Sequence, residues 1–330
     1  MSRAQGSNRE QPSGAQGTSR AQPSRREHAM VEPAEFRSYY GRPIVKEPAW
    51  EQPDVPLYLF LGGTAGASAS MAAMARLSGL PRLARAGTLV AAGGSLASVA
   101  ALIHDLGRPE RFLYMLRVFK PTSPLSVGSW ILAPFSGLAA ASAGSMLTGW
   151  LRPIGTLAGN AAGLLGPAMC TYTAVLLADT ATPAWHEGRR ELSVLFAGSA
   201  ATSGAGAALL LVPTRETAPA RRLGLAGAAA ELSAEHRLEH NLGVVSETYR
   251  DGRAGTLLKA GKALTAVGAG LSLLGTRSRV ASAAAGAAYL AAGVCTRFGV
   301  YAAGVASARD PKYTVVPQRE RMAQTGSSGQ

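Results

Sequence analysis

The sequence predicts an all-α integral membrane protein with eight transmembrane helices. Charged residues are nearly absent from eight long windows, and most of these reach the roughly 20 apolar residues that cross a bilayer core about 30 Å thick. The windows contain mainly Ala, Gly, Ser and Leu. They cover residues 55–75, 87–103, 131–151, 156–178, 192–212, 223–230 with a charged continuation, 263–275 and 280–303. The sixth and seventh windows carry the weakest signal, because charges intrude on both.

Polar ends flank these windows and explain a mean hydropathy of only +0.10. Residues 1–54 and 309–330 are rich in polar residue types and show little apolar periodicity, a composition typical of disorder. We therefore expect a disordered polar arm over residues 1–37, a membrane domain over residues 55–308 and a polar tail after it. The first apolar run begins only near Val55, so we expect no secretory signal peptide.

Small residues recur at four-residue intervals within three of the expected spans. They are Gly62 and Gly66, then Gly155, Gly159 and Gly163, then Ala266 and Gly270. Small residues at this spacing share one helical face and let helix backbones approach closely in lipid. The pattern favours tight helix packing, with a coding bias towards Ala and Gly as the open alternative.

The charges predict how the chain is oriented. An even number of spans places both termini on one side, which holds 22 of the 33 Arg and Lys residues against 9 on the opposite side. The positive-inside rule then predicts cytoplasmic termini in a cell membrane. Almost all acidic residues also lie on the termini side or in the sixth span, and only Glu216 lies opposite. Mixed charge in long loops favours docking of a soluble subunit. The alternative is that these charges only face solvent.

Ionisable residues at membrane depth are the first candidates for chemistry, since a charge buried in lipid is costly. The sixth span contains Glu231, Glu235 and His236, and the two glutamates lie four residues apart on one helical face. Such carboxylates could relay protons. The alternative is an interfacial helix end whose charges meet water and lipid headgroups, and we prefer it for Glu239 and His240.

A second group of candidates lies at the ends of the second and fourth spans, at the same surface. His104 and Asp105 end the second span, and Arg108 is placed to pair with Asp105 across a tight turn. Asp179 ends the fourth span, and Tyr172 lies about two turns deeper. These residues suit a clamped structural turn, the wall of a ligand pocket, or both.

The residue types argue against several cofactors within this chain. Cys170 and Cys295 lie inside expected spans without a CxxC motif, so we expect neither a disulfide framework nor an iron–sulfur cluster. The histidines near the membrane gather at one surface, whereas a transmembrane haem needs two on facing helices. We therefore expect no haem. The positive residues are spread over termini and loops, which argues against nucleic-acid binding.

Three segments combine apolar spans with a dense polar motif. They are DLGRPERFLYMLRVFKPTSPLSVGSW over residues 105–130, PLYLFLGGTAGASA over residues 56–69 and LLADTATPAWHEGRREL over residues 176–192. In these segments the chain resembles the NrfD family, the membrane subunits of polysulfide reductase-type complexes. The first segment is the most specific, and the resemblance runs from about residue 39 to residue 317.

The resemblance implies an eight-helix subunit without haem, and we expect its helices to pack as two four-helix bundles. It implies electron exchange between a membrane quinone, either menaquinone or ubiquinone, and a ferredoxin-like iron–sulfur subunit. That subunit would connect to a molybdopterin catalytic subunit, for example a formate dehydrogenase-like enzyme. The chain would not be catalytic on its own. We expect residues 38–54 to contact a partner. The quinone is expected near the docking surface, which would carry Asp105, Arg108, Tyr114, Asp179 and residues 231–236.

Two alternatives stay open from the sequence. A passive anchor would dock soluble subunits without touching quinone and would not need Glu231 at depth. A secondary transporter would have spans broken by Gly or Pro at matching positions of two halves. Pro167 in the fourth span has no clear counterpart in the eighth, which weakens the transporter interpretation.

Overall fold

The computed structural model describes residues 44–48, 50, 52–276 and 278–327, so the arm expected over residues 1–37 lies outside the described residues. The described chain is all-helical and contains no strand. Its long helices are α1 (Asp54–Leu77), α2 (Pro81–Asp105), α4 (Pro124–Thr148), α5 (Arg152–Ala178), α7 (Arg189–Leu211), α8 (Ala218–Asn241), α10 (Gly252–Leu274) and α11 (Arg279–Arg309). The shorter elements are α3 (Glu110–Met115), α6 (Pro183–Glu187), η1 (Thr214–Glu216), η2 (Gly243–Ser246), α9 (Glu247–Arg250) and α12 (Lys312–Ser327).

Seven of the long helices in the described chain are long and apolar enough to cross a membrane, namely α1, α2, α4, α5, α7, α10 and α11. The sequence predicts eight spans, and the sixth of these, α8, does not meet the same criterion. Its last turns, from Glu231 to His240, contain too many charged and polar residues. Nevertheless α8 is 24 residues long and packs along α7.

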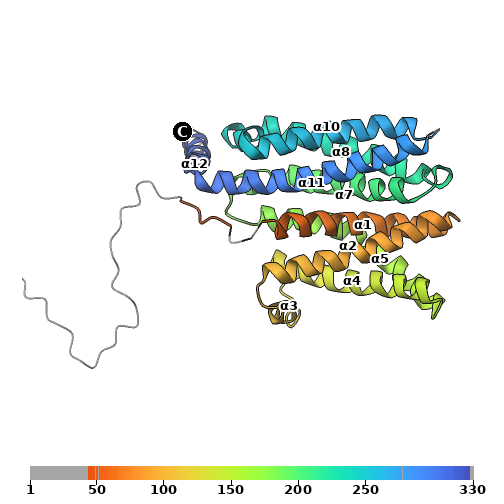
Figure 1. The fold of residues 1–330 in the computed structure, drawn as a ribbon. Helices are drawn as coiled ribbons and strands as arrows, with labels where there is room; N and C mark the ends of the chain where they lie inside the picture. The colour runs from red at the N-terminus through yellow and green to blue at the C-terminus, as the bar shows by residue number, and fades with distance from the viewer. Residues whose placement is uncertain (1–43, 49, 51, 277, 328–330) are drawn as a thin grey trace, which may run out of the picture. The chain divides into compact units, whose positions relative to one another are not determined.

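Successive long helices run in opposite directions (Figure 1). Asp54 at the start of α1 and Arg309 at the end of α11 therefore lie at the same end of the helices, which we call the termini face. The short helices α3 and α12 lie at this face (Figure 1), and so do α6, which connects α5 to α7, and α9, which connects α8 to α10. The other end, the opposite face, has short connections such as the one between Leu77 and Pro81.

The helices pack in two sets that meet along α1 and α7. Helix α1 packs on α2 and α5, and α4 also packs on α2 and α5. Helix α7 packs on α8 and α11, while α10 packs on α11 and α8. Contacts of α1 with α7 and α11, and of α5 with α7, join the two sets. Every long helix therefore has two principal neighbours within its own set.

Small residues lie where α1 and α5 cross, as the sequence predicts. A Cβ atom on Gly66 would stand 2.6 Å from the carbonyl oxygen of Gly166, and one on Gly163 would stand 3.1 Å from the carbonyl oxygen of Ala69. Neither position has room for a side chain, so the two backbones can approach closely. The prediction is wrong for Gly270, because nothing lies within 4 Å of its Cβ direction.

Several helices begin earlier than the apolar windows. The third span begins at Pro124 and not at residue 131, and the seventh begins at Gly252 and not at residue 263. Hydropathy windows miss these first turns because their residues are polar or charged. Proline in the first turn of α4 is compatible with the helix, since its missing N–H has no acceptor there in any case. Gly149 ends α4 with a φ of 73°, a left-handed conformation that favours glycine.

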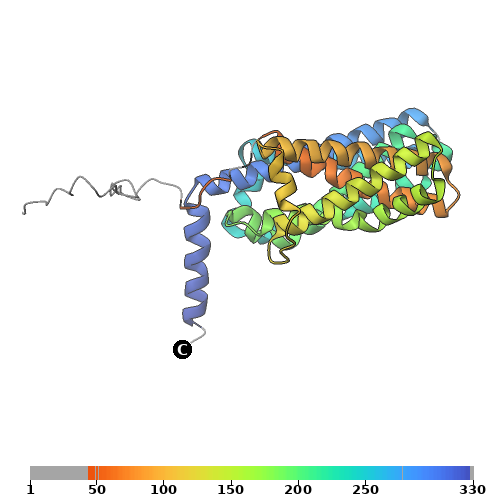
Figure 2. The same ribbon diagram turned by 90° about the horizontal axis from the view of Figure 1, so that it is seen from below.

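The polar tail is helical over most of its length, although its composition predicts disorder. Helix α12 runs across the direction of the long helices (Figure 2). Its first residue, Lys312, donates from Nζ to Oε2 of Glu247 at 2.7 Å, and Arg321 pairs with Glu187 at 2.8 Å. These contacts with α9 and α6 hold the helix at the termini face, which composition alone could not indicate.

Candidate functional site

The polar segment that follows α2 is divided between three elements. His104 and Asp105 form the last turn of α2, residues 110–115 form α3, and residues 124–130 form the first turns of α4. Nδ1 of His104 lies 2.7 Å from Oδ2 of Asp54, at the start of α1. The end of α2 and the beginning of α1 are therefore joined at the termini face.

The remaining candidates from the loop and the helix ends lie at the termini face, where Asp105 is half-buried and the others are exposed. Arg108 is exposed, and no ion pair joins it to Asp105 among the described residues. Between them, Gly107 adopts a φ of 69° and turns the chain away after α2. Tyr114 is exposed and its hydroxyl lies 3.5 Å from Oε2 of Glu110. The side chains of Arg108 and Tyr114 are therefore part of the surface of the termini face.

Asp179 and His236 also reach solvent at this face. Asp179 follows the last residue of α5. The ring of His236 contacts that of His240 in the last turns of α8, with the ring centroids 4.1 Å apart and the rings tilted by 35°. Both Asp179 and His236 are distant in sequence from the loop after α2, and within the described part of the chain no hydrogen bond or ion pair joins either of them to that loop. Their shared property is the face on which they lie.

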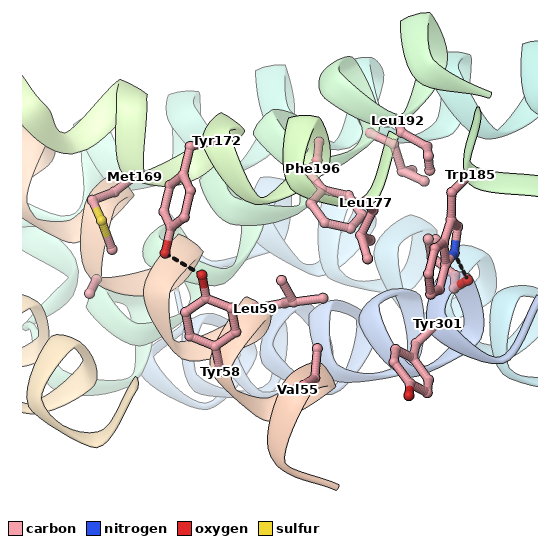
Figure 3. Packing of buried hydrophobic residues seen from close by; sticks show 14 of the residues in the cluster. Val55, Tyr58, Leu59, Met169, Tyr172, Leu177, Trp185, Leu192, Phe196 and Tyr301 are labelled. Atoms are coloured by element: carbon pink, nitrogen blue, oxygen red, sulfur yellow. Dashed lines mark hydrogen bonds between the residues drawn. The ribbon is translucent and has the colours of Figure 1, made fainter. Parts of the chain in front are cut away.

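Tyr172 differs from these residues because it is buried inside the first set of helices. Its hydroxyl lies 2.6 Å from the hydroxyl of Tyr58 (Figure 3), which is buried on α1. The pair borders a small cavity of about 10 Å³. The other lining residues come from α2, α3, α4 and α5: Leu102, Met115, Leu125, Gly128, Ser129, Leu132 and Leu176. Sequence reasoning missed Tyr58, because an isolated tyrosine near a helix end resembles an ordinary interfacial aromatic residue.

Glu231 of α8 is held by hydroxyl groups from three other helices. Thr296 of α11 donates to Oε1 at 2.9 Å, while Thr202 of α7 donates to Oε2 at 3.1 Å and Thr265 of α10 at 3.4 Å. The side chain is only 1% exposed. Glu231 lies ten residues before the end of α8, roughly 15 Å from the termini face. Sequence reasoning missed these threonines, since threonine is ordinary in an apolar span.

Two further carboxylates follow Glu231 along the same side of α8. Glu235, one turn closer to the termini face, is 5% exposed, and neither of its carboxylate oxygens has a hydrogen-bond partner in the described part of the chain. Glu239, another turn along, pairs with Lys262 of α10 at 2.8 Å. Residues four apart lie on one face of a helix. The three carboxylates therefore form a row from mid-helix to the surface.

Arg297 of α11 lies fully buried where the two sets of helices meet. Its Nη2 donates to the carbonyl oxygen of Phe196 at 3.0 Å, and its Cζ lies 3.8 Å from the centre of the Phe196 ring. A Cβ on Gly63 of α1 would stand 3.2 Å from Nη2, so the glycine leaves room for the guanidinium. Within the described residues, Nε and Nη1 have no hydrogen-bond partner. Arg297 could have been singled out from the sequence, because it is a charged residue within a predicted membrane span.

An aromatic group lies between the described end of the N-terminal arm and the second set of helices. Trp50 stacks on Trp185 of α6 at 5.8 Å between ring centroids, and Trp185 contacts Tyr301 of α11 at the same separation (Figure 3 shows the last two). Glu47 in the arm pairs with Arg309 at 3.1 Å. A cavity of about 430 Å³ lies beside this group, lined in part by Glu47, Trp50 and Tyr301. These arm residues therefore contact the chain's own helices.

Outside the spans, the clearest electrostatic effect is at the attachment of α12. Hydrogen bonding from Lys312 lowers the pKa of Glu247 below its ordinary value and raises the pKa of Lys312. Burial raises the pKa of Tyr249 in α9, whose hydroxyl donates to the carbonyl oxygen of Ala184 at 2.8 Å. Both contacts hold short elements of the termini face to one another.

No group of three or more His, Cys, Asp and Glu residues within the described part of the chain could hold a metal ion. Cys170 is free and buried, and Cys295 is free and half-buried. That the chain carries no cluster or haem of its own stays a prediction.

The fold and these buried polar groups define a multi-pass, all-α membrane protein with carboxylates held between its helices. Residues 46–225 match the family described as Polysulphide reductase, NrfD, and because this is more than half of the chain, the protein belongs to that family. Family members are membrane subunits of oxidoreductase complexes and generally assemble with iron–sulfur and molybdopterin subunits. A search of curated proteins gave no match. Glu231, Glu235 and Arg297 lie beyond the matched residues.

Proposed function

We propose that this protein is the quinone- and quinol-interacting membrane subunit of a multi-subunit oxidoreductase, which exchanges electrons with an iron–sulfur partner and anchors it to the membrane. The observation that carries the proposal is the row of carboxylates Glu231, Glu235 and Glu239 on α8. Reduction of a quinone takes up protons as well as electrons. A subunit that serves this reaction needs groups that hold protons at depth, whereas a passive anchor has no use for costly buried carboxylates.

The pair of Tyr58 and Tyr172 fits a quinone in chemistry but not in volume. A phenol hydroxyl can donate to a carbonyl oxygen, and the two hydroxyls border a cavity beneath α3. About 10 Å³ is enough for a single water molecule and not for a ring. Entry of a quinone ring would require the lining residues Met115 and Leu125 to move away from the tyrosines. We propose that His104, Asp105, Arg108 and Tyr114 form the entrance through which a quinone reaches the cavity beside Tyr58 and Tyr172.

In this proposal the chain's own residues handle the protons. Glu231 holds a proton among Thr202, Thr265 and Thr296, and Glu235 and Glu239 connect it with the termini face. A carboxyl group can both take up and release a proton, so a row of three such groups can pass protons along α8.

We propose that the termini face is cytoplasmic, in the cell membrane, and docks the iron–sulfur subunit. Support comes from the excess of Arg and Lys on this side and from the exposed Asp179 and His236. A molybdopterin subunit, for example one like formate dehydrogenase, would bind to the iron–sulfur subunit. We further propose that α8 is an eighth span and that the helices form two four-helix bundles. The packing of α8 on α7 and of each helix on two neighbours supports this arrangement.

The proposal can be tested on the complex that copurifies with the full chain. Glu231→Gln keeps the size of the side chain but removes its titration. We expect the quinone-linked rate to fall about 100-fold, as for loss of a proton-transferring group, with partner binding unchanged. Glu191→Gln, at a half-buried carboxylate of α7 outside the row, serves as the control. A Glu231→Gln complex as fast as the parent would favour the passive anchor, and a chain that copurifies without an iron–sulfur protein would refute the electron-transfer role.

The transporter alternative receives less support from the helices. Interior prolines occur at Pro134 in α4 and Pro167 in α5, which both belong to the first set. Among the described spans of the second set, no matching interior proline is present. Alternating-access transporters typically break helices at corresponding positions of both halves.

A further inference from the structure

A cavity of about 430 Å³ lies at the opposite face, between the ends of α1, α2, α4 and α5. It is separate from the residues considered above, which lie at mid-helix or at the termini face. Its lining residues are Arg76, Pro81, Ala84, Arg85, Thr88, Ser142, Ser145, Met146, Arg152, Gly155 and Thr156. Three arginines and four hydroxyl side chains thus surround this space, and none of the lining residues is acidic.

Arg76 is held in place at the inner wall of this cavity. Its Nε donates to Oδ1 of Asn160 at 3.1 Å, and its Nη1 donates to Oγ1 of Thr88 at 3.0 Å. A Cβ on Gly159 would stand only 2.7 Å from Nη2, so the glycine makes room for the guanidinium. Two of the three nitrogen atoms are thus fixed by neutral acceptors, and among the described residues the positive charge of the side chain has no counterion.

Arg85 and Arg152 complete the positive wall at the cavity mouth. Both are exposed, and neither forms an ion pair with another described residue. Arg152 is the first residue of α5, so the positive end of that helix adds to the field. The nearby carboxylate of Glu216 is used elsewhere, because it accepts hydrogen bonds from the backbone amides of Arg82 and Leu83.

The surroundings of the cavity are those of a membrane surface. Trp150, just before α5, is 73% exposed, and Leu157, in the second turn of α5, is 71% exposed. Tryptophan is enriched at the level of lipid headgroups, and exposed aliphatic side chains below it face acyl chains. Ala84 and Met146 provide apolar wall within the cavity itself. A ligand with a phosphate next to hydrocarbon matches this arrangement better than a small soluble anion.

We propose that the cavity lined by Arg76, Arg85 and Arg152 binds the phosphate of an anionic phospholipid on the side of the membrane away from the termini. The guanidinium groups are suited to phosphate oxygens, since they present planar pairs of donors. Basic pockets between transmembrane helices bind acidic headgroups by the same chemistry.

The test uses the delipidated full chain in detergent, with native mass spectrometry to measure lipid binding. Phosphatidylglycerol is the probe and phosphatidylcholine the neutral comparison. For Arg85→Gln/Arg152→Gln we expect phosphatidylglycerol to bind about 30-fold more weakly, from the loss of two cations near the headgroup. Arg215→Gln/Arg222→Gln removes the same charge from exposed positions of the same face outside the cavity, and should retain binding.

Three outcomes would overturn the proposal. One is equal binding of phosphatidylglycerol by the cavity variant and the parent chain. Another is an equal loss in the control variant, which would indicate a diffuse surface charge. The third is displacement of the lipid by inorganic phosphate at matched concentration, which would indicate a site for a soluble anion. Preference of the parent chain for phosphatidylglycerol over phosphatidylcholine, lost only in the cavity variant, would support it.

Discussion

At the scale of single residues, the positions of Glu231 and Arg297 have the clearest physical meaning. Glu231 is surrounded by three threonine hydroxyls, so its oxygens keep hydrogen bonds that they would otherwise have made to water. Arg297 keeps one hydrogen bond and the face of an aromatic ring. Groups as costly as these persist in an apolar interior when they have a use, which is why we propose that Glu231 takes part in proton transfer.

Also at the residue scale, the Glu247–Lys312 contact predicts how α12 responds to acid. The pKa of Glu247 is lower in the folded chain than its ordinary value of 4.5. The ionised carboxylate therefore stabilises the docked α12 fully when the pH is above 4.5. This contribution is lost as the pH falls below that value and through the lower pKa of the folded state. We expect protease cleavage within residues 312–322 to accelerate over this range.

Limited proteolysis with an acid-active protease, between pH 6 and pH 3 in steps of about one unit, measures the effect. Glu247→Gln is the matched variant, since it keeps the size of the side chain but does not titrate. It should be cleaved at a rate that depends less on pH than the parent. An identical pH profile for both chains would show that Glu247 does not hold α12.

At the scale of elements, the contact between α1 and α5 depends on glycine. We expect Gly66→Ala to destabilise the chain by about 1–3 kcal/mol, because the added methyl group would meet Gly166 and Met169 at distances of 2.6 and 2.7 Å. Gly93→Ala on α2 is the control, since nothing lies within 4 Å of its Cβ direction. It should be neutral, or stabilising by up to about 1 kcal/mol.

Thermal unfolding of both variants in the same detergent compares their stabilities. Equal midpoints for Gly66→Ala and Gly93→Ala would mean that α1 and α5 can separate without cost.

Helix α8 shows a different kind of contact between elements. Its surface towards α7, α10 and α11 carries the carboxylate of Glu231, where a membrane span is expected to be apolar. Thr202, Thr265 and Thr296 on those helices supply the matching hydroxyls.

At the scale of the whole molecule, the two faces differ in shape and charge. The termini face has the short helices α3, α6, α9 and α12 and mixed charges, whereas the opposite face has short connections and a cavity lined by arginines. A partner protein and a lipid headgroup would therefore bind at opposite ends of the same helices.

The orientation of these faces can be measured with single cysteines at Arg108 and Arg215, which are exposed on the termini face and the opposite face. Cys170 and Cys295 would be replaced by alanine. With intact spheroplasts and a maleimide that does not cross membranes, we expect Arg215→Cys to be labelled at once and Arg108→Cys only after lysis. The reverse order would place the termini outside the cell.

Much of the architecture follows from the sequence alone. Long apolar windows predict membrane helices because a spanning backbone must satisfy its own hydrogen bonds, and seven of the expected windows coincide with apolar helices. The sixth window gave a weak signal because α8 contains three glutamates, and these lower its hydropathy. The helical tail was missed, since charged contacts with Glu187 and Glu247 hold it, and composition does not report contacts.

The sequence by itself determined the all-helical membrane class, the family and the position of Glu231 along its helix, because hydropathy, motif and residue number along a helix are local properties. Only the tertiary structure decided what those residues meet. Tyr58 pairs with Tyr172 across 114 positions of sequence, and Glu231 gathers threonines from three helices. Such contacts depend on how helices are turned and packed against one another, which the local sequence of any one helix does not specify.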